Sequence, residues 1–408
     1  MFLENPRVTR APYDAELRHL LNIAGAHAAR VRLAEWKMLS AQSTPAWSLP
    51  GLAKAMGVAS ITMKDESKRS SLGSFKALAA PNALIELVLR RWPERKWSAD
   101  SLFAGQHAGT LQSFVVISAT DGNHGRALAA AAQSVGCRCV IVLHANVGIE
   151  RERAIAAFDA EIVRIAGDYD ESVDEAARLA RENGWHVVSD TSYEGYEEVP
   201  RDVMQGYGVI AEELLEELSD ADICPWSHVI LQGGVGGMAA GIVSYFWERF
   251  GAARPRFILV EPEQADCLMQ SAIQGNPAPA TGSVDSIMAG LACGITSPLA
   301  WRFLQPAADG FMTVSDERAV QAMRTLAHGV RRDVPVVSGE SGAAGLAGLE
   351  SLLTRLEWRK GAALDASANV LLINTEGATA PSVYAELVGR SAEEILAAQQ
   401  AWLKVGSD

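Results

Sequence analysis

One lysine, Lys76, stands where a side-chain amine could do covalent chemistry. An apolar run, residues 59–63, leads into a charged segment, and a small-residue turn, 72–74, then comes before Lys76 at the start of an Ala/Leu-rich stretch. We expect a lysine in this place to be partly buried, and burial disfavours the ammonium form and favours a nucleophilic amine. Such an amine forms a Schiff base with an aldehyde such as pyridoxal phosphate (PLP). A surface lysine after a turn would give the same local pattern, so the assignment depends on further segments.

A polar loop, residues 119–125, lies between an apolar run and an Ala-rich stretch. Its glycines and the amides at the start of the following helix can hold a substrate carboxylate. Asn123 can donate a hydrogen bond to a phenolate oxygen, and Asp121 is a candidate acid or base. The start of an ordinary helix, capped by Asp or Asn, is the alternative. The predicted substrate contacts are Thr120, Gly122 and His124.

A glycine-rich loop, residues 232–237, follows a predicted strand directly and opens a predicted helix. Its glycines let successive backbone groups curl around an anion, and the helix dipole then stabilises a phosphate. A dinucleotide-binding loop is the alternative, since Glu261 follows about one strand later. The spacing of the glycines, G-G-x-G-G, fits that alternative less well.

A hydroxyl residue, Thr375, follows the last predicted strand, 370–374. A neutral hydroxyl facing a pyridine nitrogen would leave that nitrogen largely unprotonated. An unprotonated ring nitrogen would weaken the ability of the ring to take up negative charge. It would thereby favour rapid loss of a β-leaving group. Alternatively, the side chain of Thr375 only caps the end of the strand.

Strands alternate with helices through most of the chain, as in α/β proteins with parallel sheets. The stretch 92–110 is predicted to be a loop, and a Gly/Pro/Glu-rich break near 195–200 predicts two doubly wound parallel-sheet domains facing each other across a cleft. The predicted strands are 114–118, 139–143, 161–165, 185–188, 228–231, 257–260 and 370–374. The predicted helices are 13–40, 76–91, 126–135, 149–158, 169–183, 203–218, 238–250, 318–330 and 343–356.

Composition limits the classes of partner and the cellular location. The net charge of −13 over 408 residues argues against binding to nucleic acid or an anionic membrane surface. No apolar run approaches the roughly 20 residues that span a bilayer, and the N-terminus does not resemble a secretory signal. Five cysteines without a C-x-x-C spacing predict neither a metal site nor a disulfide framework, and they fit a cytoplasmic location.

The S-F-K sequence ending at Lys76, the G-N-H-G sequence and the glycine loop together resemble fold type II PLP-dependent enzymes, the tryptophan-synthase-β and threonine-dehydratase superfamily. The resemblance covers nearly the whole chain and is strongest to the diaminopropionate ammonia-lyases. Around Lys76 the chain departs from that family, with Ser70 and Ser71 where an aromatic or aliphatic residue and Gly are usual. The segments that carry the resemblance are 64–67, 120–126, 190–196, 204–207, 287–294 and 338–343.

The resemblance implies a large PLP-binding domain, residues 1–80 with 200–408, and a small α/β domain, residues 81–199. It implies Lys76 as the Schiff-base lysine, Asp121 and Asp190 as catalytic carboxylates, and a homodimer. It also places Cys267 and Cys293 close together. The implied cofactor contacts are Lys76, Asn123, Gly233, Gly234, Val235, Gly236, Gly237, Glu340 and Thr375.

The implied reaction is the α,β-elimination of 2,3-diaminopropionate to pyruvate and ammonia. Lys76 on one face would serve an L-substrate, and Asp121 on the other face a D-substrate. Asp121 and Asp190 would also attract the additional ammonium group of a diamino acid. The alternatives are a serine, threonine or hydroxyaspartate dehydratase, a non-catalytic amino-acid-binding relative, and a nicotinamide oxidoreductase that rests on the glycine loop alone.

Overall fold

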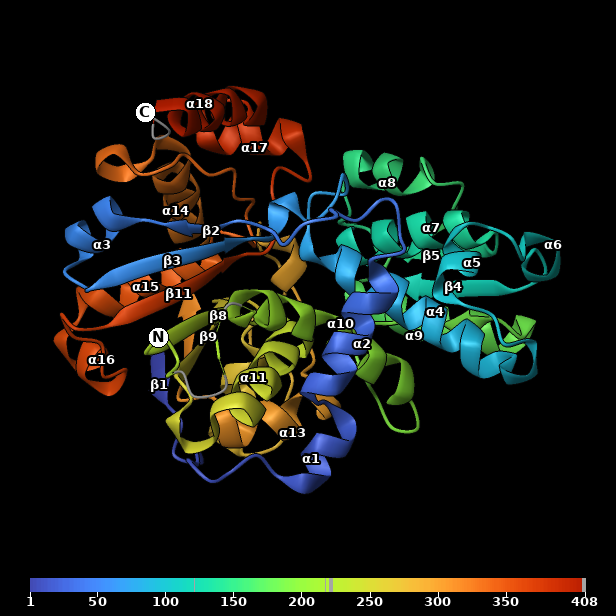
Figure 1. The fold of residues 1–408 in the computed structure, drawn as a ribbon, viewed down its shortest axis with the longest axis horizontal. Helices are drawn as coiled ribbons and strands as arrows, with labels where there is room; N and C mark the ends of the chain where they lie inside the picture. Colours follow the sequence, from blue (N-terminus) through green and yellow to red (C-terminus); the bar gives the residue numbers. More distant parts are fainter. Residues whose placement is uncertain (121, 217, 220–222, 406–408) are drawn as a thin grey trace.

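The computed structural model describes residues 1–120, 122–216, 218–219 and 223–405. Two sheets organise the described chain, one of seven strands in the order β1-β10-β9-β8-β11-β3-β2 and one of four strands in the order β6-β5-β4-β7. Figure 1 shows the larger sheet on one side of the molecule and the smaller sheet on the other, with α2 and α10 between them. The strands are β1 Phe2–Glu4, β2 Ala46–Ser48, β3 Ser60–Asp65, β4 Val115–Ala119, β5 Arg138–Leu143, β6 Glu161–Arg164, β7 His186–Val187, β8 His228–Gln232, β9 Arg256–Pro262, β10 Gly310–Val314 and β11 Asn369–Asn374.

The predicted α/β class is confirmed, but the larger sheet is not purely parallel. Its two edge strands, β1 and β2, pair antiparallel with β10 and β3, whereas its other strands pair parallel. Each of these edge strands has only three residues, and an antiparallel edge on an otherwise parallel sheet is common. The smaller sheet is parallel throughout, as predicted.

Helices pack against both sheets, and most of the predicted ones are present. The helices are α1 Ala15–Leu20, α2 Ile23–Leu33, α3 Pro50–Met56, α4 Ala80–Arg91, α5 Ala99–Phe103, α6 Ala108–Leu111, α7 Asn123–Val135, α8 Ile149–Ala156, α9 Tyr169–Asn183, α10 Glu198–Leu215, α11 Gly237–Phe250, α12 Cys267–Gln274, α13 Pro298–Ala307, α14 Asp316–His328, α15 Ala344–Thr354, α16 Leu356–Gly361, α17 Pro381–Val388 and α18 Ala392–Val405. No helix among the described residues is long and apolar enough to cross a membrane.

Three predicted stretches differ from the structure. The prediction of a single helix over 13–40 is wrong, because the helix is interrupted before Asn22. The side chain of Asn22 caps α2 by accepting a hydrogen bond from the amide of Gly25. The helix expected from Lys76 onward is a 3₁₀ turn, η2 Phe75–Leu78, followed by α4 with Pro81 in its first turn. The stretch 92–110, predicted as a loop, contains the short helices α5 and α6.

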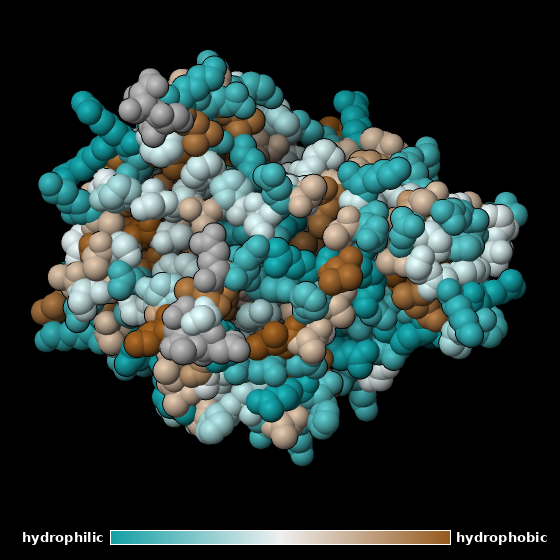
Figure 2. Space-filling model, in the orientation of Figure 1, coloured by the Kyte–Doolittle hydropathy of each residue, from teal (hydrophilic) through white to brown (hydrophobic). Residues whose placement is uncertain are grey.

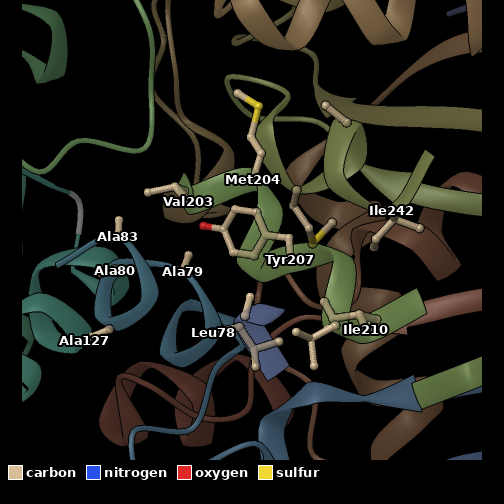
Figure 3. Close-up of a cluster of buried hydrophobic side chains, with 14 of the residues drawn as sticks. Leu78, Ala79, Ala80, Ala83, Ala127, Val203, Met204, Tyr207, Ile210 and Ile242 are labelled. Atoms are coloured by element: carbon tan, nitrogen blue, oxygen red, sulfur yellow. The ribbon is translucent and has the colours of Figure 1, made fainter. Parts of the chain in front are cut away.

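We propose the predicted boundaries for two domains, because the sheets divide in the same way. The four-stranded sheet lies within residues 81–199, and the strands of the larger sheet lie within 1–80 and 200–408. The interior is built from alanine, branched aliphatic and aromatic side chains, and Figure 3 shows one such cluster around Leu78, Met204 and Tyr207. Figure 2 shows a face on which hydrophilic side chains predominate and apolar ones are scattered in small groups.

A buried cluster of charged side chains ties the segment before Lys76 to α10. Lys64 Nζ lies 2.5 Å from Glu213 Oε2, and Arg69 Nη1 lies 2.5 Å from Glu213 Oε1. Arg69 Nε also lies 2.8 Å from the carboxylate of Glu66. All four side chains are at most 4% exposed, so each charge depends on its partners rather than on water.

Glu213→Gln is expected to lower the free energy of unfolding by about 3 kcal/mol, because it leaves the buried Lys64 ammonium without a carboxylate. Chemical unfolding of the variant and the parent chain measures this difference. Glu216→Gln is the matched control, since Glu216 is 44% exposed and its pair with Arg30 is worth less than about 1 kcal/mol. Equal losses in the two variants would contradict a structural role for the buried cluster.

Candidate active site

The pocket that contains Lys76 lies where several parallel strands end. The loops after β4, β7, β8 and β11 all contribute to its wall, as expected at the carboxyl edge of α/β sheets. Of the predicted site residues, it is lined by Lys76, Thr120, Gly122, Asn123, His124, Asp190, Gly234, Val235, Gly236, Gly237 and Thr375. Gly233 and Glu340 lie outside this lining, and Asp121 lies outside the described residues.

Lys76 is positioned by contacts between its own segment and the end of β11. The left-handed Gly73, at φ 72°, turns the chain, and Ser74 then forms a bridge with Glu376. The next amide, that of Phe75, donates to the carbonyl of Thr375 over 3.0 Å. These contacts bring Lys76 beside Thr375, although almost 300 residues separate them in the chain.

The Lys76 amine forms an ion pair with Asp190, and this pair corrects one expectation. Burial lowers the pKa of Lys76, as predicted, but the Asp190 carboxylate together with Tyr207 and Cys293 raises that pKa by more, so the ammonium is the stable form. Burial also raises the pKa of Asp190, but nearby groups, the Lys76 ammonium foremost, more than offset this and bring the pKa to about 2. Both partners are therefore charged at neutral pH, and Lys76 must lose a proton before it can act as a nucleophile.

His124 is held as a neutral imidazole with one free acceptor. Its Nε2 lies 2.9 Å from the carbonyl of Val188, which can only accept, so Nε2 carries the proton. Burial lowers the pKa of His124. Its Nδ1 is buried, lies 3.8 Å from Asp190 Oδ2, and has no hydrogen-bond partner among the described residues. This nitrogen is thus available to a donor that enters the pocket.

Asn123 donates its side-chain amide to the carboxylate of Glu376. The same carboxylate accepts from the backbone amide of Ser341 over 3.0 Å. Asn123 was predicted to face a cofactor oxygen, and the structure places it in the pocket with Glu376 as its partner. The sequence did not single out Glu376, although its position directly after Thr375 at a strand end was a usable signal.

The glycine loop divides into a sheet part and a pocket part. Gly233 donates its amide to the carbonyl of Val260 over 2.7 Å and so belongs to the sheet edge. Residues 234–237 line the pocket, and the left-handed Gly236, at φ 100°, turns the loop into the first turn of α11. The first amides of a helix have no partner within the helix and carry partial positive charge, so this end of α11 suits a phosphate.

Two cysteines flank the same loop, as the resemblance implied. The thiol of Cys267 lies 3.6 Å from the carbonyl oxygen of Gly234, and a Cβ placed on Gly234 would lie 3.5 Å from the Cys293 sulfur. Neither cysteine forms a disulfide among the described residues. They therefore pack against the phosphate-type loop without a disulfide.

Thr375 and Glu340 have different surroundings. Thr375 is 2% exposed and lines the pocket at the end of β11. Glu340 lines a neighbouring cavity of about 290 Å³, where Arg151 Nη2 lies 3.7 Å from its Oε1. Burial and the nearby Glu376 raise the pKa of Glu340 to about 7. The residues of the Lys76 pocket that the sequence did not assign include Phe75, Tyr169, Tyr207, Cys293, Ser341 and Glu376.

The arrangement fits a PLP group. An amine for the aldehyde and a glycine loop at a helix N-terminus for the phosphate open into one pocket, together with the strand-end hydroxyl of Thr375. The chain matches the family of pyridoxal-phosphate-dependent enzymes over residues 38–376.

Proteins of known function agree with this match. The diaminopropionate ammonia-lyase of Escherichia coli K12 is 36% identical over 361 residues, which cover 86% of this chain and 88% of that protein. The Salmonella typhimurium enzyme of the same name is 37% identical, with 86% and 89% covered. A biosynthetic L-threonine dehydratase of Haemophilus influenzae is 28% identical, with 62% and 46% covered.

Solved structures agree as well. The Escherichia coli diaminopropionate ammonia-lyase, in complex with an aminoacrylate–PLP azomethine reaction intermediate, superposes with a TM-score of 0.84 at 34% identity, covering 95% of this chain and 96% of that one. A threonine deaminase from Solanum lycopersicum shares the fold, with a TM-score of 0.69 at 22% identity, covering 95% and 98%. This chain is thus a fold type II PLP-dependent enzyme and belongs to the diaminopropionate ammonia-lyase family.

Proposed function

We propose that this chain eliminates the β-amino group of 2,3-diaminopropionate, giving pyruvate and ammonia. The observation that carries the proposal is the buried ion pair of Lys76 and Asp190 beside the glycine loop. It occurs in a chain that covers 88% of a diaminopropionate ammonia-lyase. An amine, a fixed negative charge and a phosphate site in one pocket are the groups that this reaction uses.

The residues that would hold the cofactor are those already placed in the pocket. Lys76 supplies the amine for the aldehyde, and residues 234–237 with the start of α11 face the phosphate. Thr375 offers a neutral hydroxyl for the ring nitrogen. When bound, the cofactor delocalises the negative charge that forms at the substrate Cα.

The polar loop after β4 is organised to receive the substrate carboxylate. Thr120 Oγ1 accepts from the amides of Gly122 and Gly125 over 3.0 and 3.1 Å, which fixes the turn into α7. The hydroxyl keeps its own proton for a carboxylate, and the helix start adds partial positive charge. The α-carboxylate is therefore held apart from the negative charge of Asp190.

Lys76 and Asp190 then have separate tasks. Lys76, as the free amine, would be a base for the Cα proton. Asp190 stays charged at neutral pH and attracts the β-ammonium group, which leaves as ammonia. A β-hydroxyl offers no charge to this carboxylate, so the pocket favours a diamino acid over serine.

This charge preference gives the test of the proposed function. The purified enzyme is expected to turn over 2,3-diaminopropionate with a kcat/KM at least about tenfold above that for L-serine, because charge-assisted hydrogen bonds are about twice as strong as neutral ones. Release of the 2-oxo acid, measured with each substrate, decides the matter. A higher kcat/KM for serine, threonine or hydroxyaspartate would favour the dehydratase alternative, for which the threonine dehydratase relatives give only partial coverage.

Asp121→Asn is expected to lower kcat for D-2,3-diaminopropionate about a hundredfold and to affect the L-enantiomer far less. The reason is that Lys76 can still take the proton of an L-substrate, whereas Asp121 is proposed to take that of a D-substrate. Initial rates with the separate enantiomers measure the difference. Equal losses on both enantiomers would remove the two-face mechanism.

We also propose a homodimer and a cytoplasmic location. The dimer is supported by the resemblance to the family, and light scattering coupled to gel filtration measures the mass in solution. The location is supported by the five cysteines, which form no disulfide among the described residues, as is usual in a reducing compartment.

A further inference from the structure

Tyr207 lines the Lys76 pocket, yet the proposed reaction gives it no task. It lies on α10 and is 1% exposed, with its ring centroid 4.9 Å from that of Phe75 and 5.9 Å from Lys76 Nζ. Figure 3 shows the ring among apolar side chains, with the hydroxyl as the polar atom of the group. Among the described residues no hydrogen bond of good geometry reaches this buried hydroxyl, although the Lys76 amine lies near enough to act on it electrostatically. Since an unpaired buried hydroxyl is unfavourable, its position at a pocket points to a partner gained during turnover.

The position of Tyr207 is fixed by unusually close packing of α10. A Cβ on Gly206 would lie 2.2 Å from the carbonyl oxygen of Leu78, so glycine lets α10 approach the turn that carries Lys76. A Cβ on Gly241 would lie 3.0 Å from the Tyr207 Cβ, so glycine also lets α11 approach α10. Tyr207 is therefore held against both the lysine turn and the helix that begins at the glycine loop.

The charge balance around Lys76 changes during the proposed reaction. Among the described residues, the titratable groups that act on Lys76 come from four segments: Asp190 after β7, Tyr207 on α10, His124 on α7 and Cys293 after the turn 289–291. Of these groups, Asp190 has its pKa lowered to about 2 and is charged at neutral pH. When it turns to the β-ammonium group of the substrate, the lysine amine needs another polar neighbour.

We propose that Tyr207 is a positioning residue for Lys76, whose hydroxyl accepts a hydrogen bond from the amine when Asp190 turns to the substrate. The bond would direct the amine toward the Cα proton. The inference rests on the proposed function, both for Lys76 as a base and for Asp190 turning to the β-ammonium group.

Tyr207→Phe tests this, because it removes the hydroxyl and keeps the ring. We expect kcat for 2,3-diaminopropionate to fall about tenfold, with KM changed by less than about twofold, as for the loss of one hydrogen bond made after binding. Tyr384→Phe is the matched control, since Tyr384 is also fully buried with an unpaired hydroxyl but lies on α17, outside the pocket. An equal loss of kcat in the control, or no loss in Tyr207→Phe, would overturn the proposal.

A second readout needs no lyase activity. In cofactor-free full-length protein, the pH dependence of reductive methylation at Lys76, followed by peptide mass spectrometry, reports the proton affinity of the amine. The comparison is made between Asp190→Asn and the Asp190→Asn/Tyr207→Phe double variant, because the Asp190 carboxylate otherwise pairs with the Lys76 amine. Removing the acceptor hydroxyl destabilises the ammonium, so the added Tyr207→Phe change should move the midpoint to lower pH by about one unit.

The two readouts separate the two hypotheses. An unchanged midpoint in the double variant would overturn the assignment of Tyr207. A shifted midpoint in the double variant, together with no lyase activity of the wild-type enzyme, would support that assignment and overturn the proposed reaction instead.

Discussion

Lys76→Ala is expected to lower kcat for 2,3-diaminopropionate by about a thousandfold or more, and to yield protein without the yellow absorption of the bound cofactor. Lys76 is the only lysine that lines the pocket among the described residues, so no neighbouring amine can replace it. The variant loses both the covalent attachment of the cofactor and the base for the Cα proton. Pyruvate release and the visible spectrum of the purified variant measure the two losses.

Lys68→Ala is the matched control for this prediction. Lys68 lies eight residues earlier, in the same segment, but its side chain does not line the pocket. We expect this variant to stay yellow, to bleach with borohydride as the parent does, and to keep its kcat. Full turnover in Lys76→Ala would rule out the central role of this amine.

Asp190→Asn is expected to lower kcat about a hundredfold for both enantiomers of 2,3-diaminopropionate. The side chain keeps its shape but loses the charge that attracts the β-ammonium group, which both enantiomers share. The variant also removes the largest of the charges that raise the pKa of Lys76, so the lysine is expected to lose its proton at lower pH. Initial rates across a range of pH measure both effects.

Asp202→Asn separates this effect from a loss of stability. Asp202 is a buried carboxylate that pairs with Arg90 over 2.6 Å, outside the pocket. We expect it to lower the melting temperature and to leave kcat unchanged, because it breaks an ion pair without touching the reaction. If Asp190→Asn kept the parent kcat, Asp190 would have only a structural role.

The sequence predicted the alternating part of the fold closely, because each strand there is a buried apolar run next to an amphipathic helix. The predicted helix 169–183 coincides with α9, and β5 differs from its predicted range by one residue. The strand β10 was not predicted, since a fully buried run of five residues has no periodicity that separates a strand from a helix. The edge strand β1 was not predicted either, because its pairing partner lies about 300 residues away.

The site was predicted from short local motifs, and its electrostatics were not. The motifs located the amine and the glycine loop because each needs only adjacent residues. The protonation of Lys76 depends on Asp190, which lies 114 residues along the chain and comes from the other sheet. Tyr207 was likewise missed as a pocket residue, because its place beside Lys76 is set by the close packing of α10. Such distances follow from tertiary packing, which no local pattern encodes.

The ratio of ammonia to pyruvate released from 2,3-diaminopropionate by the purified, PLP-loaded enzyme is the most direct test. The proposed elimination removes the β-amino group first and releases the α-amino group when the product hydrolyses. We therefore predict two molecules of ammonia for each pyruvate, with both products lost in Lys76→Ala. No turnover of 2,3-diaminopropionate, together with one ammonia for each oxo acid formed from a β-hydroxy amino acid, would contradict the account.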